Sequence, residues 1–423
     1  MSLILKNTTF VHWETLDFSH GHVKVEEGTD GSFTFYKDFG EVDISSGDEV
    51  VDCKGNLVTR SFAIGHHHAY SALARGMPPP AKTPENFLEI LKYIWWNLDK
   101  ALDRDSIEAS ALATAMACAK AGTTFVIDHH ASPNFVEGSL ELIAQAFDKV
   151  GVSHLLCYEI TDRDGQEKTE KGLAETENYL QKNQGLVGLH ASFTVGDNTL
   201  KNAVALMQKY DSGIHIHVAE DEYDQQQCMK EHGKRVVERL HDFGVLESPK
   251  TILGHCLHLT DTERELVKNS EAFIVQNTES NLNNNVGFFS SEGLGNRIML
   301  GTDGMHSDMI RSAQAAYFVG QSKDEIDFQS AYDRFVMSHN YLKENKFSGD
   351  GENNLVVLDY ESPTEINQGN FLGHFIFGFT SGHVQHVISN GKLIVKDRKL
   401  LRVDEKEIMA FAREQAKKLW KKL

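Results

Sequence analysis

The sequence has few of the residues that build cross-linked, disordered or membrane-spanning proteins. It contains five cysteines in 423 residues, an odd number, and no two of them form a C-x-x-C pair. A disulfide framework or a zinc ribbon is therefore not expected. Seven prolines and the absence of any low-complexity tract argue against a long disordered linker. No apolar run reaches the roughly 20 residues that cross a bilayer, and no secretory leader is evident, so we expect a cytoplasmic protein.

Positive charge is also scarce. Lysine and arginine together number 42 against 61 aspartates and glutamates, which gives a formal net charge of -19. A surface of that sign repels phosphate backbones and anionic lipids, so nucleic-acid and membrane partners are not expected. The composition is compatible with a small neutral or cationic molecule as the binding partner.

Short apolar segments alternate with helical patterns through the middle of the chain. We expect eight strands, at residues 62–64, 124–127, 154–157, 186–189, 214–218, 251–253, 272–275 and 297–300. Helical periodicity lies between most of them, for example at residues 105–120 and 197–209. Eight strands that alternate with helices predict an α/β fold, a parallel (β/α)8 barrel of the TIM type, over residues 60–354.

Both ends of the chain alternate in the manner of strands instead. Residues 3–7 and 21–25 show this pattern near the start, and residues 354–359 and 386–395 show it near the end. A last amphipathic helix is expected from about residue 404. We therefore predict that residues 1–59 and 355–423 form one composite β-sandwich domain with a C-terminal helix, into which the barrel is inserted.

Several histidines directly follow the predicted barrel strands. His66 and His68 are two apart, so in extended chain both rings point to the same side and one metal ion can take both. His217 lies near the end of the fifth strand, and Glu220 follows it by three residues, from where a carboxylate can reach metal-bound water. The alternatives for such residues are solvated or hydrogen-bonded turn histidines, and a packed or supporting ring is favoured for His215.

Asp303 follows the eighth strand and a Gly-Thr turn. Taken alone, an aspartate in this position is more often a helix N-cap. Together with His66, His68 and His217, however, it forms a set of three imidazoles and one carboxylate at the rim of a barrel. That set suits one divalent ion, Zn²⁺ or Fe²⁺, with a position left open for water.

Several motifs in a fixed order resemble the amidohydrolase superfamily. They are His66-x-His68, His190-Ala191-Ser192-Phe193-Thr194, His215-Ile216-His217-Val218-Ala219-Glu220, Gly254-His255-Cys256-Leu257-His258, Ser280-Asn281 and Leu300-Gly301-Thr302-Asp303-Gly304. Within the superfamily the sequence is similar to the deaminase and triazine chlorohydrolase branch. Residues 94–99, 126–133 and 219–224 carry a narrower resemblance to SsnA-type aminohydrolases.

The resemblance implies a role for each matching residue. One divalent ion per subunit would bind His66, His68, His217 and Asp303, while Glu220, His255 and Asp303 would be catalytic. The residues expected near the substrate are His190, His129, Asn281 and His258. Relatives of this kind are usually dimers, so a homodimer is expected, and the roles of His67, His215 and His306 stay open.

Three functions compete at this stage. The first is hydrolysis of a non-peptide C–N bond by a metal-bound hydroxide, as deamination of an aminated purine or pyrimidine derivative. The second is hydrolysis of a cyclic amide or a carbon–halogen bond, which the same hydroxide would serve. The third, from a different class, is a metal-binding scaffold without activity. Ammonia release separates the first two, and metal analysis with any turnover tests the third.

Overall fold

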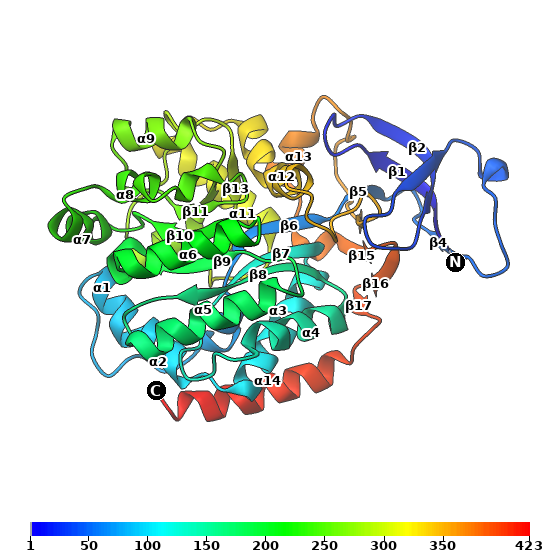
Figure 1. Ribbon diagram of the computed structural model, residues 1–423. Coiled ribbons are helices and arrows are strands. Elements are labelled where there is room, and N and C mark those ends of the chain that lie inside the picture. The colour runs from blue at the N-terminus through cyan, green and yellow to red at the C-terminus, as the bar shows by residue number, and fades with distance from the viewer. Residues whose placement is uncertain (1) are drawn as a thin grey trace.

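Eight parallel strands form the barrel predicted for the middle of the chain (Figure 1). The computed structural model describes residues 2–423. Within them these strands follow one another in chain order in a single sheet: β6 (Phe62–His67), β7 (Thr123–His130), β8 (Ser153–Ile160), β9 (Val187–Ala191), β10 (Ile214–Val218), β11 (Ile252–His255), β12 (Phe273–Gln276) and β13 (Ile298–Leu300). A parallel bridge between His67 and Asp303 brings the last strand back to the first. The predicted barrel is thereby confirmed.

The barrel strands are buried on both faces, which explains their apolar sequences. All eight residues of β7 and all five of β10 are buried, as expected where helices cover the outside and side chains fill the inside. The helices that alternate with these strands in the chain are α3 (Arg104–Lys120), α4 (Ser139–Val150), α5 (Gln166–Leu180), α6 (Asp197–Lys209), α7 (Glu222–His232), α8 (Val236–Asp242), α9 (Asp261–Lys268), α10 (Thr278–Asn284), α11 (Met309–Lys323) and α12 (Phe328–Glu344).

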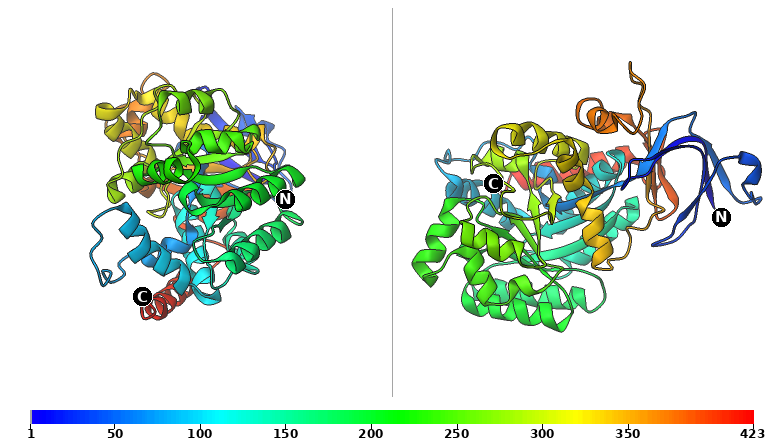
Figure 2. Two further views of the ribbon diagram at one scale, coloured as in Figure 1. Left: turned by 60° about the vertical axis from the view of Figure 1, so that its left-hand side comes forward. Right: turned by 90° about the horizontal axis from the view of Figure 1, so that it is seen from above.

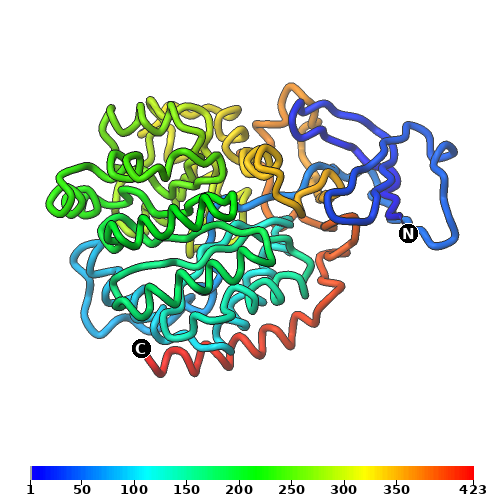
Figure 3. Tube along the Cα trace, viewed as in Figure 1, coloured from blue at the N-terminus to red at the C-terminus, as the bar shows by residue number. Residues whose placement is uncertain are grey.

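The two ends of the chain combine, as predicted, and they do so in one mixed sheet. Its N-terminal strands are β1 (Leu3–Val11), β2 (Phe18–Val25), β3 (Phe33–Tyr36), β4 (Glu49–Asp52) and β5 (Leu57–Arg60), and its C-terminal strands are β14 (Leu355–Leu358), β15 (Val384–Ser389), β16 (Lys392–Lys396) and β17 (Lys399–Leu400). Strand β5 lies parallel to β1 and antiparallel to β14, with Leu57 opposite Leu358. The join is visible where the blue and orange parts of the trace meet (Figure 3).

The C-terminal helix packs on the barrel and not on this sheet. Helix α14 (Glu405–Trp420) runs along the outside of the barrel beside α3, and the views from other directions agree (Figures 1 and 2). The Trp420 indole donates a hydrogen bond to the Leu73 carbonyl at 2.8 Å, and Lys120 pairs with Glu405 at 2.7 Å. The chain end is therefore fixed to the barrel, far from the N-terminal strands.

A second feature of the barrel is the long segment between β6 and α3. It contains the 3-10 helix η2 (Ala69–Ala74), helix α1 (Phe87–Ile90), the π-helical turn η3 (Leu91–Trp95) and helix α2 (Trp96–Ala101). The Asn86 side chain caps α1 by accepting a hydrogen bond from the Glu89 amide at 3.0 Å. Helix α13 (Phe371–Phe377) lies between β14 and β15 in the chain.

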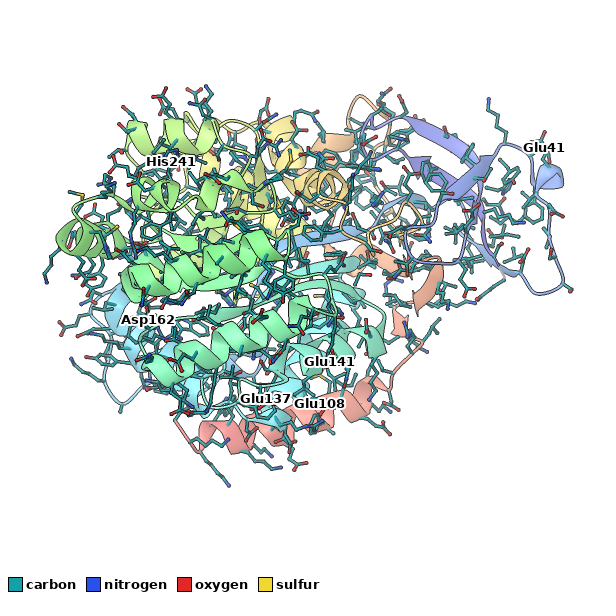
Figure 4. All side chains as sticks on the ribbon, viewed as in Figure 1. Glu41, Glu108, Glu137, Glu141, Asp162 and His241 are labelled. Atoms are coloured by element: carbon teal, nitrogen blue, oxygen red, sulfur yellow. The ribbon has the colours of Figure 1, made fainter. Side chains whose placement is uncertain are left out.

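Many charged side chains are directed outward from this framework, as the exposed acidic residues Glu137 and Glu141 at the start of α4 illustrate (Figure 4). Among the residues described, no helix has both the length and the apolar character needed to pass through a membrane.

Candidate metal centre

The carboxyl ends of four barrel strands bring the predicted ligands together. His66 lies near the end of β6 and His68 directly follows that strand, while His217 lies in β10 and His255 ends β11. Asp303 follows β13 after two residues. Because parallel strands of a barrel end at the same rim, residues that are up to 237 positions apart face one another.

The distances define one shared centre. The Nε2 atom of His68 lies 3.2 Å from Asp303 Oδ1 and 3.2 Å from His217 Nε2. The Nε2 atom of His66 lies 3.8 Å from Asp303 Oδ1, and that of His255 lies 3.7 Å from Asp303 Oδ2. Two overlapping triples, His66–His68–His217 and His66–His255–Asp303, each have their ligand atoms within 4.8 Å of one another. Five side chains therefore form a site for a divalent metal ion.

The other nitrogen of each ring is held by a hydrogen bond. The Nδ1–H groups of His68 and His217 donate to the carbonyls of His129 and His190, at 2.6 and 2.7 Å. These bonds place the proton on Nδ1 and leave the Nε2 lone pair for a metal, which is the usual arrangement around metal-binding histidines.

The two remaining rings are held by side chains. The Nδ1 atom of His66 is hydrogen-bonded to His215 Nε2 at 2.8 Å, and that of His255 to the Asn281 side-chain oxygen at 2.7 Å. The sequence left the role of His215 open, and this contact gives it one, because it sets the orientation of a predicted ligand.

Two buried nitrogens at the centre need a partner that the protein does not provide. Within residues 2–423, the Nε2 atoms of His66 and His255 have no hydrogen-bond partner, although both residues are completely buried. Burial, together with the neighbouring histidines, holds the pKa of His66 well below its usual value, so its imidazole is neutral. A neutral, buried imidazole without a hydrogen-bond partner fits a metal ligand.

The carboxylate of the site is ionised. Burial alone would raise the pKa of Asp303, but the hydrogen bond and charge of His68 outweigh burial and hold that pKa well below its usual range. In the absence of an ion Asp303 also raises the pKa of His68, against the effect of burial, and a bound divalent ion would take the place of the proton on Nε2. The backbone at Asp303 and His255 is left-handed, with φ of 50° and 68°. Such strain is often found at functional sites.

Glu220 stands beside the centre without being among its clustered ligands. Its Oε2 atom lies 3.6 Å from His255 Nε2, and the Asn284 amide donates to Oε1 at 3.4 Å. Burial raises the pKa of Glu220 to about 7, although the nearby His255 opposes the shift. A carboxylate with a pKa near neutrality is suited to both accept and release a proton.

A third group of possible ligands overlaps the first two. The atoms of His129, Glu159 and His217 also lie within 4.8 Å of one another. However, the Arg163 guanidinium already pairs with Glu159 at 2.8 Å, and His129 Nε2 lies 3.2 Å from the carbonyls of both Leu189 and His215. A cation is thus already present there, and one metal position is favoured over two.

The four residues predicted to contact substrate differ in their positions. His190 lines the cavity above the centre, whereas the other three do not. His129 packs inside the barrel, Asn281 holds His255, and His258 is hydrogen-bonded to the Val286 carbonyl at 2.7 Å. Direct contact with substrate stays a prediction for all four residues, and the lining of the cavity supports it for His190.

The two other histidines whose roles were open face away from the shared centre. His67 is hydrogen-bonded to Thr302 at 2.8 Å, and His306 pairs with Glu279.

Sequence patterns did not reveal the outer part of the cavity. The residues that line it include aromatic side chains from the segment before α3, Phe87, Trp95 and Trp96, and two carboxylates, Asp99 and Glu159. The doublet Trp95–Trp96 lies near the first barrel loop, where its sequence position is equally compatible with a lid over the pocket, with core packing and with a subunit interface.

Comparisons with known proteins agree with the site. The amidohydrolase family matches residues 65–342, about two thirds of the chain. A 5'-deoxyadenosine deaminase of Methanopyrus kandleri is 27% identical over 396 residues, with 88% of this chain and 89% of the relative covered. A 5-methylthioadenosine/S-adenosylhomocysteine deaminase of Caldanaerobacter subterraneus subsp. tengcongensis is 26% identical, with 99% of each covered.

Solved structures share the fold. An adenosine deaminase from Xanthomonas campestris with bound zinc superposes with a TM-score of 0.83 at 18% identity, covering 99% of this chain and 98% of that one. The atrazine chlorohydrolase of Arthrobacter aurescens, in complex with zinc, superposes with a TM-score of 0.81 at 12% identity, covering 98% of this chain and 100% of that one.

Proposed function

The chain belongs to the amidohydrolase family, and on that premise we propose that it is a metal-dependent aminohydrolase that removes the amino group of an adenine nucleoside. The single observation that carries this proposal is the convergence of three histidine Nε2 atoms on the Asp303 carboxylate, with the Nε2 atom of a fourth histidine, His217, 3.2 Å from that of His68. The two relatives named above are deaminases of adenine-containing nucleosides, and this supports the substrate class.

His66, His68, His217 and Asp303 would hold the ion. When bound, a divalent ion polarises water and makes hydroxide available near neutral pH. We propose one ion per chain, Zn²⁺ or Fe²⁺, because nitrogen ligands with one carboxylate suit both metals. Zinc is the metal in both solved structures described above.

The protein's own groups account for the proton transfers. Glu220 is placed to take the proton of the attacking water and to deliver it to a ring nitrogen of the substrate. His255, fixed by Asn281, faces both Glu220 and Asp303 and is placed to stabilise negative charge on the oxygen that attacks the ring carbon. Glu220, which is ionised again after the transfer to the ring nitrogen, then takes the remaining water proton from the new C–OH group and passes it to the amino group, which leaves as ammonia while the carbonyl forms.

Two finer assignments belong to the same proposal. We propose that the protein is of the SsnA type, on the basis of residues 94–99, 126–133 and 219–224, and that it acts as a homodimer. Light scattering during size-exclusion chromatography tests the dimer directly.

The decisive experiment combines metal analysis with an ammonia-release assay. The substrates are 5'-deoxyadenosine, 5'-methylthioadenosine, guanine, cytosine and atrazine, and chloride release is followed for the last. We expect about one equivalent of metal per chain and ammonia from the adenine nucleosides. Chloride release without ammonia would support the chlorohydrolase reaction instead, and no turnover with bound metal would support a scaffold.

A matched pair of variants tests the role of Glu220. Glu220→Gln should retain the metal, and its kcat should be about 10²–10⁴-fold lower, because the amide cannot carry the proton. Glu222→Gln is the control, since the Glu222 side chain is 72% exposed and outside the centre. Full activity in Glu220→Gln would overturn the assignment of the proton shuttle.

A further inference from the structure

The outer part of the substrate cavity is lined by acidic residues. Besides the groups of the metal centre, the lining contains four carboxylates, those of Asp99, Glu159, Asp221 and Asp224, and it contains no lysine or arginine among the residues described. Asp224 accepts hydrogen bonds from the Phe193 and Ala219 amides, and Asp221 accepts one from Tyr223. Backbone donors position these two carboxylates, and burial raises the pKa of Asp224 to about 7 although its two hydrogen bonds oppose the shift.

The nearest strong cation is fully occupied by other carboxylates. Arg163 pairs with Asp99 at 2.7 Å, with Glu159 at 2.8 Å and with Asp164 at 3.4 Å, and its side chain is only 7% exposed. One guanidinium thus faces three carboxylates, of which Asp164 also pairs with Lys100 at 3.2 Å. Burial raises the pKa of Asp99 to about 8 although the Arg163 charge opposes the shift, so this carboxyl keeps its charge at neutral pH only where a further cation compensates it. Releasing Arg163 toward an anionic ligand would leave buried carboxylates unpaired, which is costly.

One carboxylate oxygen in this group has no partner. Asp99 is 2% exposed and lines the cavity, and its Oδ2 atom pairs with the Arg163 guanidinium. Its Oδ1 atom has no hydrogen-bond partner anywhere in residues 2–423. An unsatisfied buried carboxylate oxygen costs free energy unless a ligand satisfies it.

Aromatic rings surround the same end of the cavity. Trp95, Trp96, Phe193 and Tyr223 all line it, and the Arg163 guanidinium lies 5.2 Å from the centre of the Trp96 ring. Aromatic faces attract cations when water is excluded. The combination of acids with aromatic rings therefore favours a positively charged group over a neutral one and excludes an anionic one.

We propose that the substrate of this enzyme carries a protonated amine in its tail, which binds Asp99 Oδ1 beside Glu159 and the indole rings, and that phosphorylated and carboxylated substrates are rejected. This inference rests on the proposed function, because it assigns the tail of the same molecule whose amino group is removed. It gives Asp99 and Glu159 the role of determining specificity.

Calorimetric binding to the metal-loaded protein tests the inference separately from turnover. The three probes share the adenosine core and differ in charge: 5'-amino-5'-deoxyadenosine, 5'-deoxyadenosine and adenosine 5'-monophosphate. We expect the amine to bind about tenfold more tightly than the neutral compound, and the phosphate at least about tenfold more weakly. The preference for the amine should shrink as the salt concentration rises.

Variants at Asp99 give an independent readout. Asp99→Asn should remove most of the preference for the amine, whereas Asp99→Glu should keep part of it. Asp105→Asn, a substitution at an exposed position of α3, should leave the ratio of the affinities for the amine and for the neutral compound unchanged.

The outcomes separate the two proposals. Tight amine binding without ammonia release would reject the deaminase function and keep the charge preference. Ammonia release would reject the charge preference alone if the three probes bound with equal affinity or if the phosphate bound more tightly than the amine. Failure of all three probes to bind would reject both proposals.

Discussion

Single hydrogen bonds decide which nitrogen of each histidine faces the metal centre. Each of the four clustered histidines has its Nδ1 atom engaged by a carbonyl or a side chain, so Nε2 is the atom left for the ion. Three of these partners, the carbonyls of His129 and His190 and the ring of His215, come from residues that are themselves histidines. The centre is therefore embedded in a histidine-rich barrel interior.

His215 offers a test of this support at the scale of one residue. His215→Phe should fill the same space but leave His66 Nδ1 without its partner at 2.8 Å. We expect metal affinity to fall about 10–100-fold, as for other supporting residues around metal ligands. Competition with a chelating dye measures the change.

The control for that measurement is His241→Phe, because the His241 side chain is 55% exposed on the surface (Figure 4). Unchanged metal affinity in His215→Phe would show that the orientation of His66 is set by packing alone.

At the scale of elements, a buried arginine joins the cavity wall to the helices outside it. Arg239 of α8 is 2% exposed, and its guanidinium donates to the carbonyls of Ser192 and Val195 at 3.0 and 2.7 Å. It also pairs with Asp197 at the start of α6 at 2.9 Å. The 3-10 turn η4 (Ser192–Thr194), which carries Phe193 into the cavity, is held in this way.

Arg239→Leu should therefore lower the free energy of unfolding by about 2–4 kcal/mol, because two buried carbonyls lose their donors. Urea denaturation measures the loss. The matched substitution Arg398→Leu removes a pair with Asp359 in which the arginine is 47% exposed, and it should cost less than about 1 kcal/mol. Equal losses in the two variants would contradict the importance of burial.

At the scale of the whole molecule, a buried ionic cluster joins the mixed sheet to the barrel. Asp350 follows α12 and pairs with Arg60 of β5 at 3.1 Å and with His339 of α12 at 2.8 Å. Burial would raise the pKa of Asp350, but His339 and Arg60 outweigh it and lower that pKa. We propose that this cluster fixes the two predicted domains, residues 1–59 with 355–423 and residues 60–354, against each other.

The lowered pKa determines the sign of the pH dependence. A carboxyl whose pKa is lower in the folded protein stabilises the fold fully above its unfolded pKa of about 4, and this stabilisation is lost as the pH falls through the folded value. Asp350→Asn should lower the free energy of unfolding by about 3 kcal/mol at pH 7, and the difference from the unsubstituted protein should narrow below about pH 4.

Denaturation at several pH values measures that difference. Asp359→Asn, at a carboxylate that is 38% exposed, serves as the control and should show a small difference at every pH. A constant difference between pH 7 and pH 3 would rule out the assigned role of the Asp350 charge.

The sequence by itself determined the strand and helix order and the identity of the clustered side chains. All eight predicted barrel strands overlap observed ones, because apolar strands and amphipathic helices are local patterns that the chain shows directly. The spacing of His66 and His68 and the placement of His217 and Asp303 after strands predicted a common rim. Closure of the barrel then brought these residues together.

Only the tertiary structure decided which groups support, neutralise or line the site. The hydrogen bond between His66 and His215 spans 149 positions, and the Arg163–Asp99 pair spans 64. The same applies to the single mixed sheet and to the packing of α14 on α3. Such contacts depend on how whole elements pack. No local period in the sequence records them, because periodicity reports which face of an element is buried and not what it is buried against.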